Sequence, residues 1–106
     1  MTQTKGPHAL TSDEAAIRTL IDHWSDAVQR EDRRAIRADH DDDILMYDVP
    51  LPFMSRGIDA YMATWEMFFD TSEKPVTFRF EDVEITAGAD VAFATAVGNC
   101  VNIDPT

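Results

Sequence analysis

One aspartate, Asp48, ends the short apolar segment ILMYDVPLPF (44–53), just before a turn that contains two prolines. Aspartate forms strands poorly and is seldom buried without a partner. Two interpretations follow. The side chain caps the turn by accepting backbone N–H groups of residues 50–53, or it points into a cavity. In a cavity with apolar walls, desolvation would make the carboxylate a better general base.

The strand expected at 44–48 would place the Asp48 side chain on the same face as two apolar side chains. Side chains alternate along a strand, so Ile44, Met46 and Asp48 share one face. If the two apolar side chains face the core, Asp48 faces it as well. We therefore assign Asp48 as the catalytic residue, if the protein catalyses a reaction.

Aromatic side chains are the second feature that suits a small-molecule site. The segment IDAYMATWEMFF (58–69) carries a heavily aromatic stripe at helical spacing, which must cover a large apolar surface. Trp24 lies on the apolar face of an earlier helix, where core packing and pocket lining both remain open. The expected ligand is a small apolar or carbonyl-containing molecule. The candidate residues that would bind it are Trp24, Tyr61, Trp65, Phe68, Phe80 and Phe93. His40 is a further candidate, which would reach the cavity mouth as a proton carrier.

Metal and cofactor chemistry has little support in the sequence. The run His40–Asp43 contains metal-ligand residue types, but consecutive loop residues do not converge easily on one ion, so no metal is expected. No glycine-rich nucleotide-binding motif is present, and no cofactor is expected. Cys100 is the single cysteine, which excludes an intrachain disulfide and favours a small buried apolar residue in a reducing compartment.

Composition limits the class of protein. The 106 residues suit one domain, and a formal charge of −11 disfavours nucleic acid and anionic membranes as partners. No apolar run approaches the roughly 18 residues that cross a bilayer. Residues 1–10, MTQTKGPHAL, lack a signal-peptide core and are expected to form a flexible leader, with a cytoplasmic location.

Local patterns predict the elements that would position these residues. Thr11 and Glu14 have capping-box spacing at the start of a helix, and Asp32 caps a second, short one. A strand at 44–48, a helix from 58 and an antiparallel hairpin over 76–101 follow. The fold class is α+β, with helices on one face of a curved antiparallel sheet. The alanines at 92, 94 and 96 suit close approach of a helix or a second subunit, and we expect a homodimer.

Four segments carry a family resemblance: AIRTLIDHWSDAVQREDRRAI, DDDILMYDVP, RGIDAYMATWEMFF and FEDVEITAGADVAFATAVGN. In order and pattern they resemble the ketosteroid isomerase-like superfamily, also called SnoaL-like or nuclear transport factor 2-like. The resemblance implies a cone-shaped fold for a single domain at 11–106. Members usually continue for two more long strands, so the domain is expected to be short at its C-terminal end.

The resemblance also implies a site. Asp48 occupies the position of the isomerase's general base, while Trp24 stands where the isomerase has an oxyanion-hole tyrosine. The position of the second oxyanion residue lies beyond Thr106. The implied function is a small-molecule enzyme of the isomerase, hydratase/dehydratase or cyclase type. A non-catalytic ligand-binding or dimerisation module of the same shape is the alternative, and the sequence leaves both open.

Overall fold

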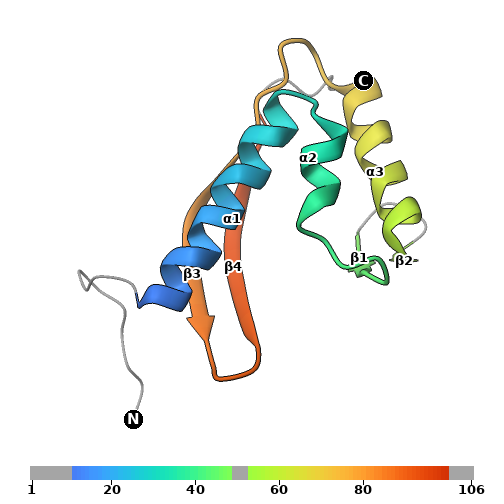
Figure 1. Cartoon of the computed structure of the whole chain (residues 1–106). Coiled ribbons are helices and arrows are strands. Elements are labelled where there is room, and N and C mark those ends of the chain that lie inside the picture. The colour runs from blue at the N-terminus through green and yellow to red at the C-terminus, as the bar shows by residue number, and fades with distance from the viewer. Residues whose placement is uncertain (1–10, 49–52, 101–106) are drawn as a thin grey trace.

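The computed structural model describes residues 11–48 and 53–100, which form three helices and two antiparallel hairpins. The α+β fold class is confirmed. Within these residues, no helix has the length and apolar character needed to cross a membrane. The expected leader 1–10 and the chain beyond Cys100 lie outside the described residues. The elements are α1 (Ser12–Gln29), α2 (Arg33–Ala38), β1 (Leu45–Tyr47), β2 (Met54–Arg56), α3 (Ile58–Thr71), β3 (Arg79–Ala87) and β4 (Ala92–Asn99) (Figure 1).

Both predicted helix starts are confirmed by their cap geometry. The Thr11 hydroxyl accepts a hydrogen bond from the Glu14 backbone N–H, and the Glu14 carboxylate accepts one from the Thr11 N–H, each at 3.1 Å. The Asp32 carboxylate accepts from the Ala35 N–H at 3.0 Å and begins α2. These side chains satisfy donors that a helix leaves unpaired at its first turn.

The strand that carries Asp48 belongs to a small hairpin. β1 pairs antiparallel with β2, which places Met46 opposite Ser55. The backbone N–H of Asp48 donates to the Phe53 carbonyl at 2.8 Å, so Asp48 lies where the hairpin turn begins. β2 is not among the elements that the sequence predicts. Its three residues, Met54–Arg56, contain only one apolar side chain and show no strand pattern.

The long hairpin contains a β-bulge that changes which side chains face inward. The β3–β4 register shifts between Glu81 and Glu84, and Asp82 adopts a positive φ of 54°. Phe80 is half-buried before the bulge, whereas Ile85 is buried after it. The extra residue therefore reverses the parity of the inward positions. The strand also begins at Arg79, later than the expected start at residue 76.

The register of β4 corrects the expected position of Phe93. Phe93 pairs with the exposed Thr86, whereas Ala94 pairs with the buried Ile85. Directly opposed residues of an antiparallel pair lie on one face, so Ala94 shares the face of Ile85, although it is itself exposed, and Phe93 lies on the other face. Phe93 is accordingly 65% exposed. Phe93 therefore lies on the face of the hairpin that points away from the interior of the fold, and it does not reach a site there.

Two contacts tie the helices to each other and to the long hairpin. The Arg33 guanidinium on α2 donates to both Glu66 carboxylate oxygens on α3 at 2.9 Å and lies 4.6 Å over the centre of the Phe69 ring. The Ser25 hydroxyl on α1 donates to the Phe78 carbonyl at 3.0 Å. The main core is formed by Ala27, Val28, Ile36, Ile58, Tyr61, Met62, Phe69, Val76 and Phe78.

Candidate functional site

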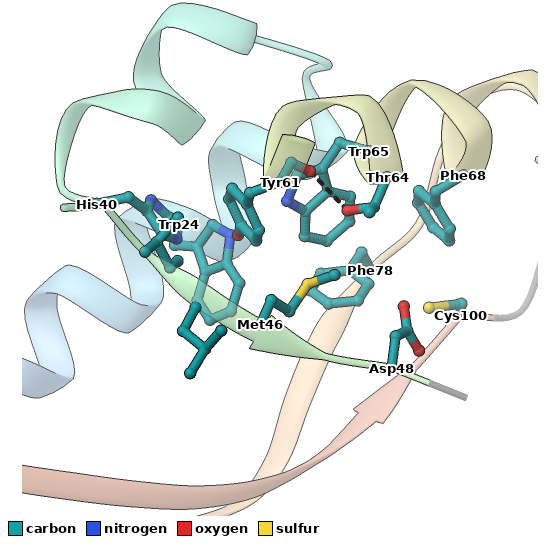
Figure 2. A pocket seen from close by; sticks show the side chains of 12 residues that line it. Trp24, His40, Met46, Asp48, Tyr61, Thr64, Trp65, Phe68, Phe78 and Cys100 are labelled. Atoms are coloured by element: carbon teal, nitrogen blue, oxygen red, sulfur yellow. Dashed lines mark hydrogen bonds between the residues drawn. The ribbon is translucent and has the colours of Figure 1, made fainter. Parts of the chain in front are cut away.

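A cavity of about 480 Å³ lies between α1, β1, α3 and the start of β3 (Figure 2). Its volume falls within the range of about 300–1,000 Å³ that is typical of small-molecule sites. Most of its walls are aromatic or aliphatic. The lining residues are Trp24, His40, Ile44, Leu45, Met46, Asp48, Tyr61, Thr64, Trp65, Phe68, Phe78 and Cys100.

Asp48 reaches the cavity through the alternation of β1. Ile44, Met46 and Asp48 all line it, and Leu45 also borders it while being 40% exposed, whereas Tyr47 is 72% exposed and is not among the lining residues. The expected shared face is therefore observed. Asp48 itself is exposed, so its carboxylate lies at an open part of the cavity, at the same end as the Cys100 thiol in Figure 2. Most of the loop that would be capped under the other interpretation lies outside the described residues.

His40 and Trp24 lie at the other end of the cavity (Figure 2). The centre of the His40 ring is 4.6 Å from that of Tyr61 and 5.5 Å from that of Trp24. Burial lowers the pKa of His40 below its ordinary value of 6.5, which favours the neutral imidazole at pH 7. His40 thus adds no positive charge to the cavity at neutral pH.

Several buried polar atoms of the cavity residues form no hydrogen bond within the described structure. They are the Tyr61 hydroxyl, the indole nitrogens of Trp24 and Trp65, and Nδ1 of His40. Burial raises the pKa of Tyr61, while the nearby indole N–H groups of Trp65 and Trp24 oppose that effect. These N–H groups therefore lie near the phenol oxygen, although neither forms a well-formed hydrogen bond with it. Unpaired buried polar atoms are uncommon, and such a group usually has a structural or functional explanation, for example a catalytic role or a bound water or ion.

The predicted ligand-binding residues divide into two groups. Trp24, His40, Tyr61, Trp65 and Phe68 line the cavity together. Phe80 and Phe93 are not among its described lining residues.

Phe80 instead packs on Trp24, with ring centres 5.0 Å apart, and borders a second hollow of about 220 Å³. Ala94 and Ala96 line that hollow with Ile21 of α1, so the alanine face lies toward this helix.

Sequence reasoning missed four lining residues, Leu45, Thr64, Phe78 and Cys100. Strand alternation carried no signal for two of them, because Phe78 and Cys100 continue the faces of Phe80 and of the alanines, which border the second hollow. Cys100 is half-buried in the cavity wall. Burial raises the pKa of its thiol, which favours the neutral form. Within 11–48 and 53–100, no three His, Cys, Asp or Glu side chains are grouped to hold a metal ion.

Comparison with known proteins places this cavity in a known fold. The model of the SnoaL-like domain matches residues 17–104, which is most of the chain. The chain belongs to the SnoaL-like domain family. This SnoaL-like chain is also similar to a solved NTF2-like protein of unknown function from Pseudomonas putida. The two are 32% identical with a TM-score of 0.79, over 90% of this chain and 67% of the other. No curated protein matches this SnoaL-like domain in sequence.

Acidification is expected to destabilise the SnoaL-like domain through His40. Its pKa is lowered in the folded state, so the unfolded chain binds more protons as the pH falls below about 6.5. Stability should therefore decrease from pH 6.5 toward pH 5, and His40→Gln should reduce that slope. Urea unfolding at several pH values measures this pH dependence of the unfolding free energy. His23→Gln, at an exposed position of α1, is the control, and an unchanged slope in His40→Gln would contradict the prediction.

Proposed function

We propose that this SnoaL-like domain binds a small apolar molecule with a carbonyl group and uses Asp48 as the general base that acts on it. The observation that carries the proposal is the position of Asp48 in the wall of a cavity whose other lining residues are mostly aromatic or aliphatic. An ionised carboxylate at that position accepts a proton from a bound ligand.

The reaction that this arrangement supports best is isomerisation by proton transfer. For a β,γ-unsaturated ketone, Asp48 removes a proton from the carbon that lies between the carbonyl group and the C=C bond. The electrons of the broken C–H bond form a second carbon–carbon double bond, and the carbonyl oxygen takes the negative charge of the resulting dienolate. The protonated Asp48 then gives the proton to the γ-carbon, the carbonyl group re-forms, and the remaining C=C bond ends next to it. The same first step begins dehydration of a β-hydroxy carbonyl compound, in which hydroxide leaves and water is the second product.

The charges around the cavity favour a neutral substrate. Asp48 is the one acidic residue among the described lining residues, which include no lysine or arginine. The whole chain carries a formal charge of −11. An anionic ligand would meet a carboxylate without a compensating cation, which is unfavourable at short range. A neutral ketone or enone has no such penalty.

The exposure of Asp48 favours a second candidate function. A general base is most effective where water is excluded, and Asp48 lies at an exposed position. A non-catalytic ligand-binding domain would need the apolar cavity alone. The homodimer and the cytoplasmic location inferred from the sequence also stay proposals. For the homodimer, Val91, Phe93 and Val97 supply exposed apolar surface at 79%, 65% and 56%.

Proton exchange tests catalysis without knowledge of the natural substrate. We expect the folded protein in D₂O near pH 7 to accelerate deuterium uptake at the carbons next to the carbonyl group of 2-decalone, a bicyclic ketone. Proton NMR follows the loss of these signals, and heat-denatured protein at equal concentration is the control. If 2-decalone binds to the protein but its deuterium uptake is not accelerated, the catalytic proposal is contradicted and the non-catalytic ligand-binding function is favoured.

A further inference from the structure

We propose that the Tyr61 hydroxyl is the group that recognises the oxygen of the ligand, and that the indole N–H groups of Trp24 and Trp65 position it for that purpose. This inference rests on the proposed function and deepens it, because it names the atom that selects the ligand class. An apolar ligand with a hydrogen-bond acceptor at one end would place that acceptor against Tyr61.

The burial of Tyr61 is the first support. The residue is only 4% exposed, yet it lines the cavity and its hydroxyl oxygen has no well-formed hydrogen bond within the described structure. An unsatisfied buried hydroxyl costs about 1–3 kcal/mol. A ligand that restores the missing bond would recover part of that free energy, so the cavity favours ligands with a matching group.

The arrangement of the two tryptophans is the second support. Tyr61 and Trp65 are four residues apart on α3 and so share one side of the helix, while Trp24 approaches from α1. The ring centres of Trp65 and Tyr61 are 6.4 Å apart and those of Trp65 and Trp24 are 6.3 Å apart, both nearly perpendicular. Figure 2 shows the indole nitrogen of Trp24 beside the Tyr61 oxygen. Residues far apart in the sequence thus bring polar hydrogens to one place.

The chemistry of these groups specifies the ligand atom. An indole N–H donates and never accepts, whereas a phenol oxygen accepts up to two hydrogen bonds and donates one. If the two indoles donate to Tyr61, its own proton remains for the ligand, and donation to the oxygen strengthens that proton as a donor. The Thr64 hydroxyl, which also lines the cavity, already donates to the Tyr61 carbonyl at 2.6 Å. Its proton is committed, and the cluster therefore requires an acceptor such as a carbonyl oxygen.

His40 restricts the orientation of the tyrosine. Its ring packs against the Tyr61 ring with 4.6 Å between their centres, and the rings are inclined by 35°. This contact limits rotation of the phenol ring and keeps its hydroxyl near the two indoles. A donor held in place before the ligand arrives binds with a smaller entropic cost.

Intrinsic fluorescence provides a direct test. The chain contains two tryptophans, and both line the cavity, so their emission reports its occupancy. We expect Tyr61→Phe to weaken binding of 2-decalone about tenfold, as for the loss of one hydrogen bond. Binding of decalin, which lacks the oxygen, should change less than about twofold. Tyr47→Phe makes the same chemical change at a position that is 72% exposed and should alter neither affinity.

Two further measurements distinguish this inference from the proposed function. Asp48→Asn should abolish proton exchange and keep the preference for 2-decalone over decalin, because recognition belongs to Tyr61. The carbonyl stretching frequency of bound ¹³C=O-labelled 2-decalone should be lower in the wild type than in Tyr61→Phe. Equal ketone affinity in wild type and Tyr61→Phe, or equal loss for ketone and hydrocarbon, would overturn the inference. If Tyr61→Phe does not fold, a wild-type carbonyl frequency equal to that in a hydrocarbon solvent would overturn it.

Discussion

Replacement of Asp48 by asparagine is expected to slow the protein-catalysed proton exchange of 2-decalone by roughly 10²–10⁴-fold, which is the usual contribution of a general base. Asparagine has nearly the same shape as aspartate but does not accept the proton. The hairpin should persist, because the bond that closes it runs from the Asp48 backbone N–H to the Phe53 carbonyl at 2.8 Å. The exchange rate is measured by proton NMR, and the fold is checked by circular dichroism.

A matched substitution separates this effect from a change in overall charge. Asp90→Asn also removes one carboxylate, at an exposed position in the β3–β4 turn and outside the described lining of the cavity. It should leave the exchange rate within about twofold of the wild type. Undiminished exchange in Asp48→Asn would remove Asp48 from the mechanism, and an equal loss in Asp90→Asn would point to an effect of net charge alone.

Truncation of Phe69 to alanine is expected to cost about 3–5 kcal/mol of unfolding free energy, as for other buried aromatic residues. Phe69 is 2% exposed. Its ring is stacked on Trp65 at 6.0 Å between centres and lies beneath the Arg33 guanidinium. Removing the ring leaves a void between α2 and α3 that surrounding groups fill only in part. Urea denaturation followed by circular dichroism measures the loss.

Phe93→Ala is the matched control, since it deletes the same side chain from a position that is 65% exposed. Its effect should stay within about 0.5 kcal/mol for the monomer. Similar losses in the two variants would contradict the assignment of Phe93 to the outer face. A loss at Phe93 that grows with protein concentration would instead show that a second copy covers this face, as the proposed homodimer requires.

Local sequence determined the helices of this protein and the face of β1 that carries Asp48. Thr11 with Glu14, and Asp32 with Ala35, are three residues apart, so each cap forms within a single turn of chain. The alternation from Ile44 to Asp48 likewise depends on backbone geometry alone. Such features need no knowledge of distant contacts, and for this reason they were predictable.

The course of the long hairpin depended on pairing between strands. Nothing local in FEDVEI indicates that Asp82 adopts a φ of 54° and interrupts the alternation. The bulge is favoured because it returns Ile85 to the interior after Phe80, and this gain exists only when α1 covers the hairpin. The same pairing places Phe93 opposite Thr86 on the outer face, against the prediction that it lines the site.

The open cavity was decided by tertiary structure alone. The sequence showed aromatic residues at helical spacing, but it did not show whether their side chains would fill the space between α1 and α3 or leave about 480 Å³ open. That outcome depends on the separation and tilt of helices that are joined through α2 and the short hairpin. The approach of the Trp24 indole nitrogen to the Tyr61 hydroxyl depends on the same separation, because these two residues are 37 positions apart and meet only when the helices pack.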